Sequence, residues 1–363
     1  MDASLQHLLD RAAIRDVMMR YAQAVDRRDW VLLETVFVPE VTGEFAGAPR
    51  ANRDELIEFI AGVEFFEVSE HFMGHPWIEI DGDRAAMFTP SMLVHRGRNP
   101  DGSVIRYDTA EMPYREGLER RADQWQIVRR DEPVPEFVTG VRGLWSEDPV
   151  VAWLLDHAAI DDALTRWTQA RNADGLSYVT THHLGHPIVV FDSDHAEVAL
   201  RAVLIERRGP IELASDALAW SPRWEELDIS PLSLHFELKR RGEVFEIQHW
   251  EDASDPPSDV LVPPDGVSAE QAPLVDRLRL RDRIAREAWQ ADVAEPEGGI
   301  RLLGNQWLPE PGTLETYCLR VPQEGSWGDG AFRRIDSLVG EVGEVSIQAT
   351  ESRVLFGSEP DPR

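Results

Sequence analysis

At 363 residues the chain is long enough for two or three domains, and its 42% hydrophobic and 28% charged residues are ordinary for a globular protein. The formal net charge is −29, and Lys239 is the only lysine. Such a chain would be repelled by nucleic acid and by anionic lipid, so neither is an expected partner.

The sequence shows no run of about 18 apolar residues, so no membrane span is expected. Its N-terminus has no basic segment followed by an apolar one, which argues against a secretory signal. Cys318 is the only cysteine and excludes an intramolecular disulfide. Together these features predict a cytoplasmic protein.

Residues 5–28 are predicted to form a helix, because apolar side chains recur there at spacings of three and four. A second helix is expected to start at Trp30, with Asp29 as its N-cap, and to end at Pro39.

A short strand over 41–45 and a third helix over 54–63, capped by Asn52, are expected next. Every later segment up to residue 130 reads as strand, with predicted strands at 68–80, 84–96, 104–116 and 124–130. Three helices followed by antiparallel strands predict an α+β fold in which the helices cover one face of a curved sheet.

The segment that opens at His71 recurs along the chain. His71-Phe72-Met73-Gly74-His75-Pro76 and its Asp-Gly hairpin correspond to His182-His183-Leu184-Gly185-His186-Pro187, and a fainter copy covers 301–321. The sequence therefore predicts three parts: a complete domain at 1–137, a truncated repeat at 138–263 and a degenerate repeat at 264–363.

Asp26 and His71 are the candidate catalytic residues. A carboxylate at the C-terminal end of a helix opposes the helix dipole, and such local conflicts are often functional. An imidazole beside a carboxylate can serve as a general base, because the carboxylate fixes the tautomer and stabilises the imidazolium. Taken singly, Asp26 could equally be a solvated or capping carboxylate, and a lone histidine is more often structural.

Only the first copy holds both members of this pair. The second copy keeps His182 but has Asn172 in place of the carboxylate, and the third has Asp292 but Arg301 in place of the histidine. Close-spaced histidines such as His71 and His75 do not by themselves make a zinc site, which needs three or four converging ligands, so no metal is predicted.

The first part resembles the SnoaL-like branch of the nuclear transport factor 2-like superfamily. The resemblance rests on Arg11 through Asp16, Tyr21, Asp26, Asp29-Trp30, His71 through Gly74, and Trp125 through Arg130. It implies a cone-shaped, curved antiparallel sheet closed by helices, with a pocket inside, followed here by two truncated copies.

Within that branch the chain is similar to scytalone dehydratase, bile-acid dehydratase and hexachlorocyclohexane dehydrochlorinase. By this resemblance His71 would remove a proton next to the leaving group, and Asp26 would orient and charge-balance it. The second active-site histidine of scytalone dehydratase has no counterpart that can be placed; Tyr107 lies nearest. Arg130 would match an arginine that is common near the end of the last strand in this family. Strand alternation, however, places Arg130 on the other face of the strand from Trp125 and Ile127.

The resulting hypothesis is a cofactor-independent, dehydratase-type lyase acting on a hydrophobic cyclic molecule such as a polyketide, steroid or terpenoid. The alternatives are a non-catalytic small-molecule-binding or assembly protein, and an isomerase or cyclase that uses the same pocket. Open sheet faces in the shortened copies also suggest either an intimate interface between the repeats or a homodimer. The residues expected to contact the substrate are Tyr21, Tyr107, Arg130, Met73, Phe37 and Met92.

Overall fold

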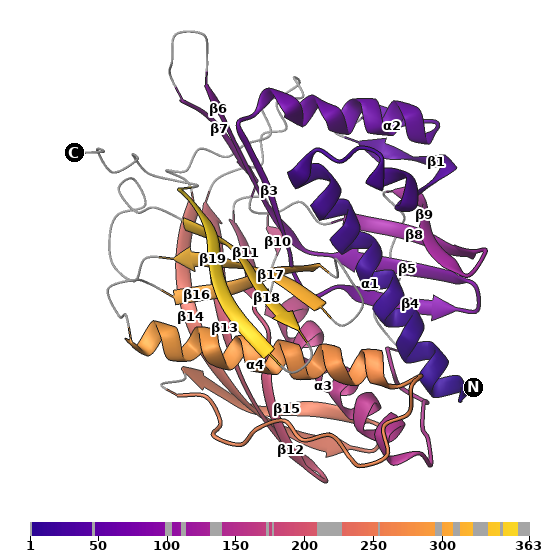
Figure 1. Ribbon diagram of the computed structural model, residues 1–363, viewed down its shortest axis with the longest axis vertical. Coiled ribbons are helices and arrows are strands. Elements are labelled where there is room, and N and C mark those ends of the chain that lie inside the picture. Colours follow the sequence, from indigo (N-terminus) through magenta and orange to yellow (C-terminus); the bar gives the residue numbers. More distant parts are fainter. Residues whose placement is uncertain are drawn as a thin grey trace. The chain divides into compact units, whose positions relative to one another are not determined.

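The computed structural model describes two compact units, shown in Figure 1. The N-terminal unit is built on Leu9–Gly140, and the C-terminal unit takes Val141–Gly209 and Trp224–Arg363 together with Met1–Leu8. The backbone is described for residues 2–45, 48–98, 104–109, 114–130, 140–171, 174–175, 178–208, 227–252, 255–294, 300–307, 313–321, 333–341 and 344–354.

Helix α1 (Ala3–Arg27) agrees with the predicted first helix. Its apolar stripe is buried, as expected for a helix that packs one face against a sheet. The stripe consists of Ile14, Val17, Met18, Tyr21 and Val25. Helix α2 (Arg53–Ile60) is also as predicted: the side chain of Asn52 accepts a hydrogen bond from the backbone N–H of Glu55.

The predicted second helix is wrong. Only a short 3₁₀ turn, η1 (Leu32–Thr35), forms there, although Asp29 does accept a hydrogen bond from the Leu32 N–H. Strand β1 (Phe37–Phe45) begins at once and includes Pro39. Sheet pairing to β9 (Gln124–Arg130) overrides the weak helical pattern of so short a segment.

The described strands of the N-terminal unit form two sheets. The larger sheet has the order β2-β1-β9-β8-β5-β4 and the smaller has the order β3-β6-β7. All pairs are antiparallel except β1 with β9. The remaining strands are β2 (Ala48–Arg50), β3 (Val68–Met73), β4 (Trp77–Asp81), β5 (Arg84–Thr89), β6 (Ser91–Arg98), β7 (Val104–Thr109), β8 (Tyr114–Arg121) and β9 (Gln124–Arg130).

Three of the four predicted strands are divided, with one half in each sheet. The first two divisions lie side by side at Gly74 and Pro90, where the Gly74 N–H donates to the Pro90 carbonyl at 2.7 Å. Proline has no N–H to continue a ladder, and a Cβ on Gly74 would lie 2.8 Å from the Pro90 ring. The α+β prediction is confirmed, and these divisions are how the strands turn from one sheet into the other.

Where the structure describes it, the C-terminal unit contains helix α3 (Pro149–Arg171), helix α4 (Ala272–Ala294) and two antiparallel sheets. The segment that opens at His182 and the segment at 301–321 both form hairpins, as their likeness to the His71 segment predicts, whereas β18 was not expected. Its strands are β10 (Asp174–Gly175), β11 (Tyr178–Leu184), β12 (Ile188–Asp192), β13 (His195–Arg208), β14 (Leu227–Arg241), β15 (Val244–Asp252), β16 (Ile300–Trp307), β17 (Thr313–Val321), β18 (Arg333–Glu341) and β19 (Glu344–Val354).

Several contacts recur in both units. The Gly185 N–H donates to the Arg201 carbonyl at 2.7 Å, as Gly74 does to Pro90. In the N-terminal unit an ion pair joins Arg120 to Asp10 on α1 at 2.6 Å, and in the C-terminal unit Arg240 pairs with Asp156 on α3 at 2.5 Å. Each arginine also lies over an aromatic ring on the next strand, Trp125 at 4.8 Å and Phe245 at 4.7 Å.

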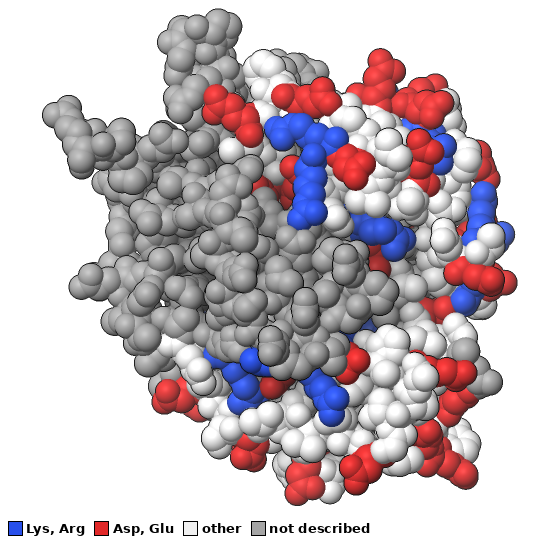
Figure 2. All heavy atoms as spheres, viewed as in Figure 1, with Lys and Arg blue, Asp and Glu red and all other residues white. Residues whose placement is uncertain are grey.

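Acidic and basic side chains are interspersed on the described part of the face shown in Figure 2. Lys239 lies half-buried on β14, the strand between β13 and β15, with Glu246 opposite it in the register of β15. Within the described residues, none of the helices has the length and apolar character needed to cross a membrane.

Candidate functional site

The C-terminal end of α1 holds Asp26 in place. Arg28 adopts a left-handed conformation (φ 56°), its N–H donates to the Val25 carbonyl, and the Asp29 N–H donates to the Ala24 carbonyl at 2.8 Å. This is a Schellman motif, which ends a helix sharply. The Arg28 side chain also donates to the Phe66 carbonyl at 2.6 Å, two residues before β3 begins.

Strand β3 carries His71 directly against this helix end. The Nδ1 atom of His71 lies 2.7 Å from Oδ1 of Asp26, and the backbone N–H of His71 donates to Oδ2 at 3.2 Å. Each of the two side chains is only 3% exposed. The carboxylate therefore holds both the ring and the backbone of the histidine, and the structure brings together the two residues singled out by the sequence.

Burial, and secondly the charge of Arg130, lower the pKa of His71 to about 3. The imidazole is therefore neutral near pH 7. With Asp26 ionised, Nδ1 carries the proton and donates it to the carboxylate, so Nε2 is the basic nitrogen. The arrangement can accept a proton at Nε2 and stabilise the resulting imidazolium through Asp26.

A cluster of aromatic rings around Arg130 borders the pair. Tyr21 lies edge-on to His71, with ring centroids 5.8 Å apart, and edge-on to Tyr114 at 5.3 Å. The guanidinium carbon of Arg130 lies 4.3 Å from the Tyr21 ring and 4.8 Å from the Tyr114 ring. Its Nε is 2.6 Å from Oε1 of Glu116, so the buried positive charge has a buried counter-charge.

Arg130 is buried, and the prediction from strand alternation that it faces away from Trp125 and Ile127 is wrong. A bulge in the pairing of β8 with β9 is the reason: Leu118 pairs with Ile127, while Gly117 pairs with Arg129. The extra residue reverses the alternation beyond Ile127, so that Arg130 turns to the buried face. A bulge leaves no clear sequence signal.

Burial raises the pKa of the Tyr114 phenol, and the neighbouring Tyr21 phenol adds to this effect. Tyr114 therefore stays protonated over the whole physiological range and can act as a hydrogen-bond donor. Neither Tyr114 nor Glu116, the ion-pair partner of Arg130, was expected at the site from the sequence. Both lie on β8 and are brought to the site by its pairing with β9, which the sequence alone does not specify.

A second histidine also lies at the site. The rings of His95 and His71 have centroids 5.7 Å apart, and His95 is stacked on Phe66 at 5.1 Å. Burial, and secondly His71, lower the pKa of His95 to about 3. From the sequence, only Tyr107 was expected near this position; Tyr107 pairs with His95 in the register of β6 and β7.

The other predicted contact residues divide into two groups. Phe37 and Met73 are buried, and Phe37 lies edge-on to Tyr21 at 6.0 Å. The side chains of Met92 and Tyr107 lie outside the described part of the structure. Among the described residues no three histidine, cysteine or acidic side chains converge in a way that could hold a metal ion.

Comparison with solved structures gives similarities that cover about a third of this chain. The Kfla4162 protein from Kribbella flavida is 23% identical, with a TM-score of 0.31, over 34% of this chain and 88% of that one. A candidate scytalone dehydratase from Novosphingobium aromaticivorans is 19% identical, with a TM-score of 0.31, over 36% and 91%. A candidate dehydratase of the NTF2-like family from Streptomyces avermitilis is 16% identical, with a TM-score of 0.30, over 35% and 98%.

Comparison with curated proteins finds no match. The family model of the SnoaL-like domain matches residues 6–131, which include α1 from Gln6 onward, the Asp26/His71 pair and all described strands of the two N-terminal sheets. The predicted resemblance is confirmed over this range: the N-terminal part of the chain, residues 6–131, is a SnoaL-like domain.

Proposed function

We propose that the N-terminal unit is a cofactor-independent lyase that eliminates water from a hydrophobic cyclic molecule. The contact between Asp26 and His71 carries this proposal, because a buried imidazole held by a carboxylate at 2.7 Å is a general base with a fixed tautomer. Both reactive groups belong to the protein, so the proposed reaction needs no metal or organic cofactor.

In the proposed step, Nε2 of His71 takes a proton from the carbon next to the one that bears a hydroxyl group. The electrons of the broken C–H bond form a carbon–carbon double bond as the C–O bond breaks. The imidazolium then returns the proton to the departing oxygen, so one water molecule is lost overall. Asp26 stabilises the imidazolium while it exists.

The surroundings support a neutral substrate. Arg130 is paired with Glu116, and its guanidinium lies over the rings of Tyr21, Phe37 and Tyr114. Its charge is therefore already balanced and does not favour an anionic substrate. Tyr21 and the protonated Tyr114 are the proposed hydrogen-bond donors to a carbonyl or hydroxyl group, with Met73 as apolar lining.

An isomerase or cyclase could use the same base, and a non-catalytic binder is the second candidate. The binder is favoured by one sequence observation: the second and third parts each lack one member of the pair. It would use the aromatic cluster around Tyr21 without proton transfer.

The experiment compares His71→Ala and Asp26→Asn with the wild-type chain on a panel of cyclic β-hydroxy ketones, following the ultraviolet absorbance of the conjugated ketone product. His71→Ala should lower the rate by about two orders of magnitude or more. His195→Ala is the matched control, because His195 and Asp194 lie at the same 2.7 Å but are exposed on a hairpin. Wild-type turnover that survives His71→Ala would refute the base assignment, and binding of a panel member without turnover would favour the binder.

We also propose that residues 138–263 and 264–363 are shortened copies of the domain at 1–137. The recurring Gly185–Arg201 hydrogen bond and the Asp156–Arg240 ion pair support the first of these copies. They occupy the positions that correspond to Gly74–Pro90 and Asp10–Arg120 when the repeated segments are aligned.

A further inference from the structure

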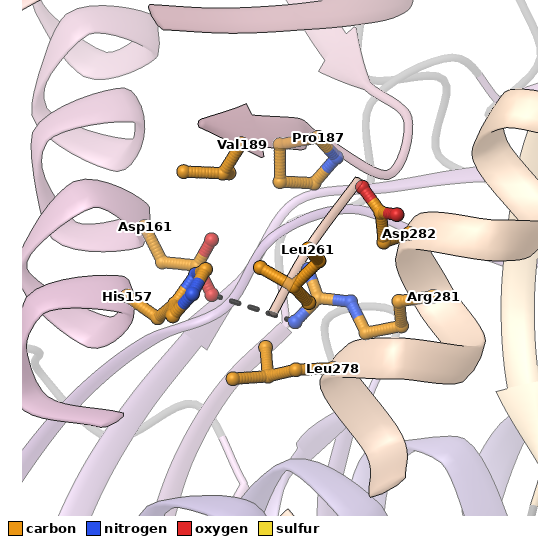
Figure 3. A pocket seen from close by; sticks show the side chains of 8 residues that line it. All are labelled: His157, Asp161, Pro187, Val189, Leu261, Leu278, Arg281 and Asp282. Carbon is orange, nitrogen blue, oxygen red and sulfur yellow. Dashed lines mark ion pairs between the residues drawn. The ribbon is translucent and has the colours of Figure 1, made fainter. Parts of the chain in front are cut away.

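A small cavity lies inside the C-terminal unit, between helices α3 and α4 and the start of β12. Figure 3 shows the side chains of His157 and Asp161 on α3 and of Arg281 on α4 turned toward one another across it. The space open to the centre of a water molecule is about 10 Å³, close to the minimum that one water needs. The lining residues are His157, Asp161, Pro187, Val189, Leu261, Leu278, Arg281 and Asp282.

Several polar atoms in this lining have no hydrogen-bond partner within the described part of the chain. They are Nε2 of His157, Nε and Nη2 of Arg281, and Oδ1 of Asp282. All three residues are 5% exposed, so bulk water does not satisfy these atoms. Buried polar atoms in native proteins are nearly always paired, often through an ordered water molecule.

The charges around the cavity cancel. Arg281 pairs with Asp161 at 3.5 Å, and Arg286 donates to Oδ2 of Asp282 at 2.9 Å. Burial lowers the pKa of His157 to about 3, so this ring is neutral and adds no charge. Neither an anion nor a cation is favoured by such a balance. The unpartnered atoms include two donors, both on Arg281, and two acceptors, Nε2 of His157 and Oδ1 of Asp282.

We propose that the cavity binds one water molecule that joins α3 to α4. The water accepts a hydrogen bond from Arg281 and donates to Oδ1 of Asp282 and to Nε2 of His157. It is the occupant that matches the size, the neutrality and the mixed donors and acceptors of the site. The site is separate from the Asp26/His71 pair and makes the pairing of the two helices depend on a bound solvent molecule.

A crystal structure of the full chain, grown in bromide, tests the proposal directly. One water-sized density peak is expected within hydrogen-bond distance of Arg281, without anomalous signal at the bromine edge. An empty cavity would overturn the proposal. An anomalous peak would also overturn it, because the occupant would then be an anion.

Melting temperatures provide a second test in solution. His157→Leu should lower the melting temperature, and His157→Gln should lower it less, because glutamine keeps a polar group for the water. His249→Leu, at an exposed histidine of β15, is the matched control and should leave it unchanged. A His157→Leu protein that melts with the wild type would contradict a structural water. The proposal would also be contradicted if the difference in melting temperature between wild type and Arg281→Met grew when bromide replaced fluoride, because the cavity would then bind an anion.

Discussion

Two histidine–carboxylate pairs have the same separation but very different burial. His71–Asp26 and His195–Asp194 both lie at 2.7 Å, but the first pair is 3% exposed on each side, and the second is 66% and 55% exposed. Water screens the exposed pair, so its net contribution is small. The buried pair is desolvated, which is why His71 stays neutral and available as a base.

The buried neutral histidines make stability depend on pH. His71, His95 and His157 have a pKa of about 3 in the folded chain, against about 6.5 in the unfolded chain. Between these values the unfolded state binds more protons, so stability falls as pH falls below about 6.5. Each such histidine contributes a slope of up to about 1.4 kcal/mol per pH unit.

His157→Gln should therefore reduce the dependence of the unfolding free energy on pH by up to about 1.4 kcal/mol per pH unit, the contribution of one histidine. Urea unfolding at pH 6 and pH 5 measures it, with His195→Gln as the exposed control. An unchanged slope in His157→Gln would show that this ring is already protonated in the folded protein.

The buried pair of Arg130 and Glu116 gives a sharper prediction. Glu116→Gln leaves the Arg130 guanidinium without its counter-charge and should cost about 3–5 kcal/mol of unfolding free energy. Glu119→Gln, on the same strand, removes a half-buried partner of Arg84 and Arg121 and should cost about 1 kcal/mol or less. Chemical denaturation compares the two. Equal losses would mean that the Arg130 charge reaches solvent.

At the scale of elements, sequence periodicity located helices and strands but not their bends. The apolar stripe of α1 and the Asn52 cap of α2 are local signals, and both were predicted correctly. The division of strands at Gly74 and Pro90 depends on two segments meeting across the sheet, so no local pattern reveals it. Asp26 and His71 were predictable because a carboxylate at a helix end and a repeated histidine segment are visible in the sequence. His95 and Tyr114 are brought to the site by strand register and were missed.

The bend at Gly74 should tolerate no side chain. A Cβ there would lie 2.8 Å from Cγ of Pro90 and 3.1 Å from its carbonyl oxygen. Gly74→Ala should therefore lower the unfolding free energy by about 1–3 kcal/mol. Gly62→Ala is the matched control, because a Cβ there meets no atom within 4 Å. If both variants unfold alike, the strands can separate at this bend without loss.

For the whole molecule, a net charge of −29 means that compact units form against their own electrostatic repulsion. Added salt screens this repulsion, because the Debye length shortens to about 3 Å at 1 M. The temperature of the first melting transition should therefore rise by a few degrees when sodium chloride is increased from a low concentration to about 0.5 M. Scanning calorimetry checks this, and a flat or falling transition would show that local ion pairs outweigh the net repulsion.

Lys239 offers a reporter that needs no engineering. It lies half-buried on β14, with strands paired on both sides. A lysine-specific protease can cleave the chain internally only after Lys239. The rate at which the two fragments appear therefore reports how often the sheet around β14 opens. Amine-directed cross-linkers are restricted in the same way, since any bridge between side-chain amines must join Lys239 of one molecule to Lys239 of another.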